Sequence, residues 1–497
     1  MSLAILYTRA NLGVNAPLVT VEVHISAGLP CLAIVGLPEA AVKESKDRVR
    51  SAILNSHLEF PARRITVNLA PADLPKEGGR FDLAIALGIL AASGQIPLQK
   101  LSNYEFLGEL ALSGELRPIA GALPAALACA DNQRELIISE HSSSEAALST
   151  TSRVFGAKSL LQVCAHLHDR EHLFQAHAPE SLDSEQALDM HDVKGQGQAK
   201  RALEIAASGG HNLLFFGPPG TGKTMLASRL PGILPRLSER EMLEVAAVYS
   251  VAAQTQAHSW RTRPFRSPHH TASAIALVGG GSNPKPGEIS LAHCGVLFLD
   301  ELPEFQRPTL EVLREPLESG EVRISRARTQ ACFPARFQLI AAMNPCPCGY
   351  YGNSDDRCRC TAEQVRRYRD RISGPMLDRI DMHVPVRALR QGELHGKNEG
   401  DSSTIIRERV EQARARQIER QGKANHQLGA PDLEKYCVLS DGDKALLEHA
   451  INKMGLSTRA YHRVLKVART LADMQNKIQP DTENITEALS YRTLDRR

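Results

Sequence analysis

The sequence predicts an α/β protein of several domains that ends in a helical part. Three observations support this prediction. Strand-like and helix-like runs alternate over the first third of the chain, a glycine-rich loop joins an apolar run to a helical pattern near the middle, and helical patterns dominate after residue 404. At 497 residues the chain is too long for one ordinary hydrophobic core, so we expect about three domains.

Composition limits the class of protein and of partner. The chain has 59 Lys and Arg against 56 Asp and Glu, a net charge of +3, so a polyanionic partner has to meet local basic patches. The longest apolar run, Leu83 to Ala92, is far shorter than a membrane span, and Met1 to Gly13 lacks the pattern of a signal peptide. We therefore expect a soluble cytoplasmic protein without a membrane partner.

The first domain is expected at residues 1–177, as an α/β layer structure. Residues 178–190 carry Pro, Ser and acidic residues without a clear period, which indicates a linker. The strand-like runs of the domain are Val19 to Ile25, Ile65 to Leu69 and Leu136 to Ile138, and its helix-like runs are Glu39 to Asn55, Phe81 to Ser93 and Ala122 to Ala130.

The second domain, expected at residues 191–389, contains a phosphate-binding loop. The sequence GPPGTGKT at Gly217 to Thr224 follows the apolar run Leu213 to Phe216 and precedes the helical pattern Met225 to Arg229. In such a loop the backbone N–H groups surround a triphosphate, the lysine reaches the β and γ phosphates, and the last hydroxyl ligates Mg²⁺. We expect the nucleotide to be bound by Gly217, Gly220, Thr221, Gly222, Lys223 and Thr224.

Two later apolar runs end in residues suited to nucleotide hydrolysis. Gly295 to Leu299 is followed by Asp300, suited to hold Mg²⁺, and by Glu301, suited to polarise the attacking water. Phe337 to Met343 is followed by Asn344, suited to hydrogen-bond the γ-phosphate or the water. The alternatives are an ordinary strand end, and an asparagine that turns the chain before the next proline.

Two arginines are candidates for stabilising phosphate charge. Arg379, within Pro375 to Asp381 (PMLDRID), offers a rigid cationic fork, with a surface salt bridge as the alternative. After a glycine- and serine-containing joint at 390–404, residues 405–497 are expected to form a helical lid. Arg459 begins one of its helical patterns, where a cation is disfavoured by the helix dipole unless a phosphate or carboxylate lies nearby.

A four-cysteine loop is expected at residues 346–360. Two Cys-x-Cys pairs are separated by nine residues, and four thiolates fit a structural zinc ion, with free thiols as the alternative. Four thiolates leave no open position for catalysis at the metal. The other six of the ten cysteines are scattered, which favours reduced thiols. The cysteines of the loop are Cys346, Cys348, Cys358 and Cys360, and the surrounding Tyr and Arg residues suit either DNA or a subunit interface.

Together these motifs resemble those of AAA+ ATPases, and their order resembles the magnesium-chelatase-like branch and, within it, the ComM/YifB family. The resemblance rests on RPFRSPHHT at Arg263 to Thr271, PGEISLAH at Pro286 to His293, and NPCPCG at Asn344 to Gly349, and it covers essentially the whole chain. It implies a P-loop core that uses ATP and Mg²⁺, with the ion held by Thr224 and Asp300.

The same resemblance assigns roles to single residues. It implies that Val193, within the sequence DVKGQ, borders the adenine and that Asn344 is the sensor-1 residue. It also implies that Arg379 is an arginine finger acting on the nucleotide of a neighbouring subunit, and that Arg459 is the sensor-2 residue of the lid. The active unit is then a homo-oligomeric ring, expected to be a hexamer, and a single subunit hydrolyses ATP poorly.

Two segments are expected to face the pore of this ring. One is the insertion from Phe265 to Ile289, and the other is a hairpin from Glu321 to Arg336. Arginines of this hairpin suit contacts to a phosphate backbone without reading sequence, with a solvated face as the alternative. Adjacent side chains alternate faces in an extended chain, so we expect His269 and His270 to have a loop role rather than to share a metal ion. The hairpin arginines are Arg323, Arg326 and Arg328.

The first domain resembles the Lon-protease-like fold of the ribosomal S5 domain 2 type. The residues that carry the resemblance are PKEGG at Pro75 to Gly79 and LSGELRPIAG at Leu112 to Gly121. Peptidases of that fold need a serine just after the first motif and a lysine just after the second. Arg80 and the region of Leu123 occupy these positions, so we expect no peptidase activity.

The resemblance implies an ATP-dependent DNA translocase or helicase. Such a motor promotes branch migration while transforming DNA is integrated by homologous recombination. Single-stranded or branched DNA then lies in the ring pore, and recombination proteins are candidate partners. One alternative is a motor that remodels a protein partner, as in magnesium chelatase. The other is a nucleotide-switched DNA-binding scaffold, which a complete hydrolytic set argues against.

Overall fold

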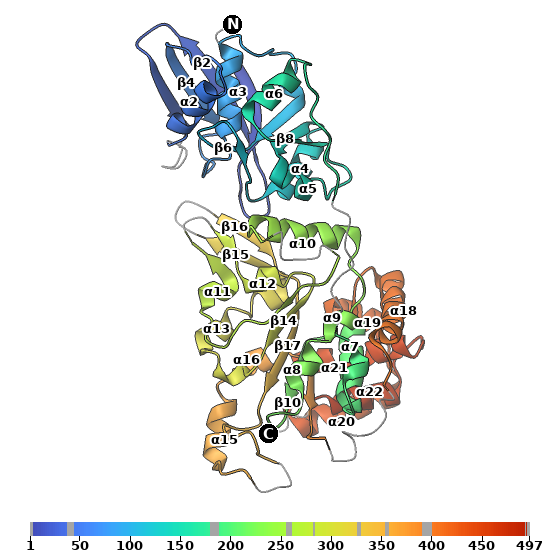
Figure 1. Ribbon diagram of the computed structural model, residues 1–497. Coiled ribbons are helices and arrows are strands. Elements are labelled where there is room, and N and C mark those ends of the chain that lie inside the picture. Colours follow the sequence, from blue (N-terminus) through green and yellow to red (C-terminus); the bar gives the residue numbers. More distant parts are fainter. Residues whose placement is uncertain are drawn as a thin grey trace.

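A computed structural model describes residues 3–36, 44–178, 188–254, 261–281, 284–325, 330–352, 357–389, 400–492 and 494. An N-terminal α/β domain lies above a central α/β domain, and a group of helices from the end of the chain packs beside the central domain (Figure 1). The α/β class with a helical C-terminal part, predicted from the sequence, is confirmed.

The N-terminal domain is built on a seven-stranded mixed sheet with the order β3-β4-β2-β1-β5-β8-β9. Helix α3 is apolar and buried along its whole length, because it lies directly on β1 and β2. A Cβ at Gly88 of this helix would lie 2.5 Å from Val23 Cγ2, so glycine permits the close approach. The elements are β1 (Leu3–Arg9), β2 (Leu18–Ser26), β3 (Cys31–Val35), α2 (Ser45–Asn55), β4 (Arg64–Ala70), α3 (Asp82–Ala92), β5 (Tyr104–Leu107), β6 (Glu109–Leu110), β7 (Leu116–Arg117), α4 (Ala122–Asp131), β8 (Glu135–Ser139), α5 (Glu140–Ala146), β9 (Val154–Ala157) and α6 (Leu160–Leu167).

The central domain is built on a five-stranded parallel sheet with the order β11-β14-β17-β10-β18. Its three middle strands are almost entirely buried apolar runs, as expected for a parallel sheet covered on both faces. The strands are β10 (Leu213–Phe216), β11 (Phe265–Arg266), β14 (Val296–Leu299), β17 (Gln338–Met343) and β18 (Met382–Pro385).

Short helices and two small hairpins surround this sheet. The first hairpin, β12 (Gly279–Gly280) with β13 (Lys285–Pro286), and the second, β15 (Glu321–Ser325) with β16 (Gln330–Pro334), are both antiparallel. The helices are α7 (Gly197–Gly209), α8 (Lys223–Ala227), α9 (Leu230–Ile233), α10 (Glu239–Val251), α11 (Ala274–Val278), α12 (Glu288–Leu291), α13 (Arg307–Glu311), α14 (Pro316–Ser319), α15 (Ala362–Arg369) and α16 (Gly374–Leu377).

The helical lid shares one hydrophobic core with the central domain. Val464 and Leu471 of the lid and Leu203 and Phe215 of the central domain belong to a single buried cluster. The lid returns to the sheet at its end, where the Tyr491 carbonyl accepts a 2.7 Å hydrogen bond from the His383 N–H of β18. The helices are α18 (Ser403–Gln421), α19 (Ala430–Tyr436), α20 (Asp441–Met454), α21 (Thr458–Met474) and α22 (Thr482–Ser490).

The N-terminal and central domains meet along α4 and α10. The Gly121 N–H donates to the Ser250 carbonyl at 3.0 Å, and Leu123, Leu148 and Ala246 form a small buried cluster between the domains. The β15–β16 hairpin also lies below the N-terminal domain (Figure 1). The two domains therefore form two stacked layers.

The predicted linker and joint lie mostly outside the described residues. Where the chain resumes, Met190 is fully buried in the core of the central domain, and the Asp189 carboxylate accepts a 3.0 Å bond from the Ser403 N–H. The ends of these two segments thus belong to the packed structure, because they tie the start of the central domain to the start of the lid. Among the described helices, none is both long and apolar enough to cross a bilayer.

Candidate nucleotide and metal sites

The phosphate-binding loop connects β10 to α8 at the carboxyl edge of the parallel sheet. Gly220 and Gly222 have φ values of +76° and +87°, a conformation that glycine adopts without strain, and Gly222 is the N-cap of α8. The Thr221 hydroxyl donates to the Pro218 carbonyl at 3.0 Å. The backbone at Gly217 runs so close to β18 that a Cβ there would lie 2.0 Å from the Val386 carbonyl oxygen. The loop is therefore fixed by backbone geometry.

The Lys223 side chain lies inside this loop. Its Nζ donates to the carbonyl oxygens of Gly217 and Pro218, both at 2.8 Å, and to Asn344 Oδ1 at 3.2 Å. Burial lowers the pKa of Lys223, and the nearby carboxylates of Asp300 and Glu301 oppose this shift. Asn344, at the end of β17, thus faces the same space as the loop lysine.

Thr224 and Asp300 provide oxygen ligands of the kind that Mg²⁺ prefers. Thr224 Oγ1 donates to Asp300 Oδ2 at 2.6 Å, and Asp300 Oδ1 accepts a 2.9 Å bond from the Glu301 N–H. A hydroxyl and a carboxylate so close to a phosphate-binding loop match the ligation of Mg²⁺ in nucleotide sites. The predicted pair therefore lies in contact, although 76 residues separate its members.

Glu301 follows β14 in a left-handed conformation with φ +51°. Its Oε2 lies 3.2 Å from His270 Nδ1. The rings of His269 and His270 lie side by side with centroids 4.1 Å apart, because the chain turns here instead of running extended. Our premise that the two rings take opposite faces was therefore wrong, and the link between His270 and Glu301 was missed. Both residues follow paired strand positions by four residues, but this signal appears only once the strand pairing is known.

Val193 is fully buried in the core of the central domain. Beside it, Gln196 caps α7 and its Nε2 donates to the carbonyls of Thr221 at 3.2 Å and Arg387 at 2.8 Å. This side chain therefore connects the segment DVKGQ to the phosphate-binding loop and to the chain after β18. No local pattern in the sequence predicts this role for the glutamine of the motif.

Arg379 is buried and paired, but with neither neighbouring aspartate. Its Nη2 donates to Glu318 Oε1 at 2.6 Å and its Nη1 to the Pro375 carbonyl at 2.6 Å. Burial lowers the pKa of Arg379, and Arg314 and Arg459 lower it further. Arg459 is exposed in the first turn of α21, close enough for its charge to act on Arg379. Glu318, 61 residues before Arg379, could not be identified from the sequence.

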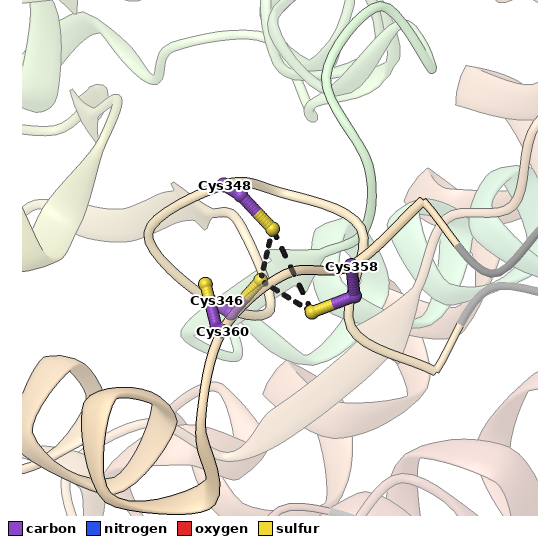
Figure 2. A group of neighbouring side chains, drawn as sticks. All are labelled: Cys346, Cys348, Cys358 and Cys360. Atoms are coloured by element: carbon purple, nitrogen blue, oxygen red, sulfur yellow. Dashed lines mark hydrogen bonds between the residues drawn. The ribbon is translucent and has the colours of Figure 1, made fainter.

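The four cysteines of the loop after β17 converge on one point (Figure 2). Sulfur to sulfur distances are 3.3 Å for Cys346 and Cys348, 3.6 Å for Cys348 and Cys358, and 3.8 Å for Cys346 and Cys358. A tetrahedral zinc ion with Zn–S bonds of about 2.3 Å requires S–S distances of about 3.8 Å. Cys360 completes a set whose sulfurs all lie within 4.8 Å of one another. The donor set therefore fits zinc.

Backbone N–H groups favour a thiolate at Cys348, whereas burial and the neighbouring sulfurs raise the pKa of Cys358 to about 11 and also raise that of Cys360. The N–H groups of Tyr350 and Arg359 lower the pKa of Cys348 to about 6, and the Tyr351 N–H donates to Cys346 Sγ at 3.3 Å. The loop also contacts the nucleotide site, since a Cβ at Gly349 would lie 2.7 Å from Pro219 Cδ of the phosphate-binding loop. All ten cysteines lie in the described part of the chain, and each is free of a disulfide.

The hairpin predicted at Glu321 to Arg336 is present as β15 and β16. Val322 and Ile324 are buried, while Arg323 is exposed between them and pairs with the Glu321 carboxylate at 2.8 Å. The Arg323 guanidinium is therefore exposed to solvent on one face of the hairpin, and the Glu321 carboxylate partly neutralises its charge. The other two arginines predicted to contact DNA, Arg326 and Arg328, lie outside the described residues.

In the N-terminal domain, the two positions that carry the catalytic dyad in peptidases are buried. Arg80 is 7% exposed, and burial lowers its pKa to about 10. Leu123 is fully buried against the central domain. Neither side chain provides the hydroxyl or amine that a serine–lysine dyad needs.

Three family models match this chain. They are "Magnesium chelatase, subunit ChlI" at residues 189–394, "Subunit ChlI of Mg-chelatase" at 21–142 and "Magnesium chelatase, subunit ChlI C-terminal" at 400–492. Fold, site geometry and these matches define a magnesium-chelatase-like AAA+ protein.

Relatives that match this chain along its whole length identify the family within this class. Competence protein ComM of Haemophilus influenzae is 54% identical over 503 residues, covering 100% of this chain and 98% of that protein. The protein YifB of Salmonella typhimurium is 53% identical over 498 residues, covering 100% of this chain and 98% of its own. The chain therefore belongs to the ComM/YifB family. Lon protease 2 of Bacillus subtilis is 26% identical over 179 residues, 31% of this chain and 32% of that protein, in line with a Lon-like N-terminal fold.

Substituting Gly217 tests how tightly the phosphate-binding loop is packed. We expect Gly217→Ala to lower the free energy of unfolding by about 1–3 kcal/mol, since the added methyl group meets the Val386 carbonyl. Gly197→Ala is the matched control, because nothing lies within 4 Å of a Cβ at that helical position. There we expect a gain of about 0.4–1 kcal/mol. Equal urea unfolding midpoints for the two variants contradict the close contact.

Proposed function

We propose that this protein is an ATP-driven DNA translocase that promotes branch migration during integration of transforming DNA. The observation that carries the proposal is a complete set of hydrolytic groups in a chain that matches a protein named for competence along its whole length. Competence is the bacterial state in which external DNA is taken up. A motor that moves DNA strands is one activity that an ATPase can supply when such DNA is integrated.

The proposed hydrolysis assigns each group at the carboxyl edge of the sheet a task. The loop N–H groups and Lys223 hold the phosphates, and Thr224 and Asp300 hold Mg²⁺, which neutralises phosphate charge when bound. Glu301 accepts the proton of the attacking water, and Asn344 orients that water or the γ-phosphate. The bonds that Lys223 makes to two loop carbonyls and to Asn344 support this assignment, because phosphate oxygens can take over the same donor.

We propose that hydrolysis occurs between subunits of a homo-oligomeric ring, expected to be a hexamer. Arg379 pairs with Glu318 of its own chain, and the charge of Arg459 lowers the pKa of Arg379, which supports a shared role for the two guanidiniums. We propose Arg379 as the finger that acts on the nucleotide of a neighbouring subunit and Arg459 as the lid arginine. Val193 is proposed to border the adenine through the motif that Gln196 fixes to the loop.

DNA contact is proposed at the β15–β16 hairpin and at the insertion that contains β12 and β13. Arg323 supports this proposal through its exposed position between two buried side chains. Arginines that touch only the phosphate backbone allow movement along any sequence. Arg326 and Arg328 are proposed to add to the same contact.

A structural zinc ion is proposed in the four-cysteine loop. Four thiolates would saturate its coordination, so the ion would stabilise the loop rather than take part in hydrolysis. The contact between Gly349 and Pro219 supports an indirect role, since the shape of this loop bears on the phosphate-binding loop.

DNA-dependent turnover is the direct test of the motor. We expect single-stranded or branched DNA to raise the ATP turnover of the full chain, and the protein to move a three-stranded junction only when ATP is present. Arg323→Gln is expected to lower the DNA-stimulated rate at about 0.2 M salt, where each lost phosphate contact weakens binding. Arg153→Gln, an exposed arginine paired to one glutamate in the N-terminal domain, is the control. Turnover that ignores DNA but responds to a protein partner favours the protein-remodelling motor instead.

Mixing two inactive variants tests the shared site. We expect Lys223→Ala and Arg379→Ala subunits to regain partial turnover together, because an intact loop then meets an intact finger at hybrid interfaces. The control mixture, Lys223→Ala with Glu301→Gln, places both defects in the same half of the site and should stay inactive. Failure of the first mixture at all ratios contradicts a finger that acts in trans.

Metal analysis tests the zinc ion. We expect about one zinc per chain in protein purified without chelators, and tetrahedral thiolate absorption after replacement by Co²⁺. Cys348→Ser and Cys358→Ser should lose the metal, whereas Cys31→Ser, which removes an exposed distant thiol, should keep it. Wild-type protein that binds neither zinc nor cobalt contradicts the proposal.

A further inference from the structure

We propose that Glu318 positions the Arg379 guanidinium for the nucleotide of a neighbouring subunit, and that it passes any displacement of the β15–β16 hairpin to this guanidinium. Glu318 is then a positioning residue that links DNA contact in one subunit to hydrolysis in the next. The inference rests on the proposed function for the finger and for DNA at the hairpin. The link itself rests on contacts within one chain.

Two acceptors hold the Arg379 guanidinium. Its Nη2 donates to Glu318 Oε1 and its Nη1 donates to the Pro375 carbonyl, both at 2.6 Å. Among the residues that the structure describes, none accepts a hydrogen bond from the buried Nε of Arg379. A guanidinium has more N–H groups than these bonds use, and the remaining ones form part of a planar fork that suits phosphate oxygens. Arg379 is therefore fixed on one side and still able to donate on the other.

Glu318 supplies the negative charge that this buried arginine needs. The Arg379 side chain is only 7% exposed, and burial lowers its pKa, whereas the charge of Glu318 raises it. The charges of Arg314, Arg459 and Arg463 lower this pKa further, so like charges act on the guanidinium from three other residues. Without Glu318, burial and this repulsion are no longer offset, and we expect the guanidinium to leave its position.

The ion pair borders an open surface cavity. Glu318 is 56% exposed, and both side chains line this cavity together with residues of the segment from α13 to α14. A cavity that is open to solvent lets a group of the neighbouring subunit approach the free N–H groups of Arg379. The finger can therefore keep its bond to Glu318 while it donates to a phosphate. The lining residues are Glu311, Arg314, Glu315, Glu318, Ser319 and Arg379.

Glu318 also lies directly before the hairpin proposed to contact DNA. Helix α14 ends at Ser319, and β15 begins at Glu321. The Ser319 hydroxyl donates to the Glu321 carbonyl at 3.0 Å, and the Gly320 carbonyl accepts a 2.7 Å bond from the Ala335 N–H, which follows β16. Both strands of the hairpin are thus tied to the end of α14. Because packed segments transmit strain, a displaced hairpin moves the helix that carries Glu318.

A second link holds the two backbone segments together without Glu318. The Ser373 hydroxyl donates to Glu311 Oε1 at 2.7 Å, which joins α13 to the segment that leads to Arg379. Loss of the Glu318 carboxylate therefore frees the finger side chain and leaves this backbone contact in place. A substitution at Glu318 can for this reason separate positioning of the guanidinium from folding of the segment.

Substitution of Glu318 tests its effect on turnover. We expect Glu318→Ala to lower ATP turnover by about tenfold to a hundredfold, the equivalent of one hydrogen bond between charged groups, with little change in KM, because the finger acts on the transition state. The ratio of turnover with and without single-stranded DNA should fall toward one. Glu318→Gln keeps an acceptor oxygen and should restore part of the rate. Glu315→Ala, which removes another exposed glutamate of the same cavity and leaves the Arg379 pair intact, is the control.

Mixed subunits separate positioning of the finger from a folding defect. We expect Glu318→Ala and Lys223→Ala subunits to regain partial turnover together, since the intact finger of the second then meets the intact loop of the first. Glu318→Ala mixed with Arg379→Ala should gain nothing, because both defects lie on the finger side of the interface.

Distinct outcomes separate this inference from the proposed function. If DNA stimulates the wild type and Glu318→Ala keeps the same turnover and ratio, the inference is wrong while the motor stands. If the variant loses turnover and Lys223→Ala does not rescue it, Glu318 is structural, which also overturns the inference. If rescue occurs but the variant alone keeps the wild-type ratio, the link to the hairpin is wrong. If DNA has no effect on the wild type, the proposed function fails, and rescue alone decides whether Glu318 positions the finger.

Discussion

The parallel register of the central sheet is the constraint on which the site depends. Strands β10, β14 and β17 point the same way, so the groups that follow them reach one edge regardless of their separation in the chain. Lys223, Asp300 and Asn344 come from three different strand ends, and hydrogen bonds join Lys223 to Asn344 and Thr224 to Asp300. A buried lysine is tolerated there because carbonyl and amide oxygens surround its ammonium group.

Local patterns predicted the fold and the central part of the site well. The phosphate-binding loop, the two apolar runs ending in Asp300 and Asn344, and the start of α21 at Thr458 all have signals within a few residues, and each lies where its pattern indicated. Three N-terminal strands, β2, β4 and β8, and the lid helices were found for the same reason, since their periods follow from one face being buried. The relatives confirm the family that these motifs indicated.

Contacts made by distant segments could not be predicted in this way. Glu318 lies in a short helix with no feature that marks it as the partner of Arg379, and the orientation of Arg323 toward Glu321 depends on rotamers rather than on pattern. His269 and His270 were assessed as an extended pair, but the chain turns at that point and the two rings lie side by side, tilted by 33°. The approach of His270 to Glu301 can be explained once the strand register is known. It cannot be predicted from the sequence alone, because the sequence does not show which strands pair.

The end of the lid and the predicted finger are joined mechanically. Arg492 donates to the Ile380 carbonyl at 2.6 Å, one residue after Arg379, and Arg463 of α21 pairs with Asp381. The segment that carries Arg379 is therefore held by the lid as much as by the sheet. In a closed ring of such subunits, a lid that tilts would also move Arg379 at the interface with the neighbouring subunit. A conformational change in one subunit would then alter the nucleotide site of the next.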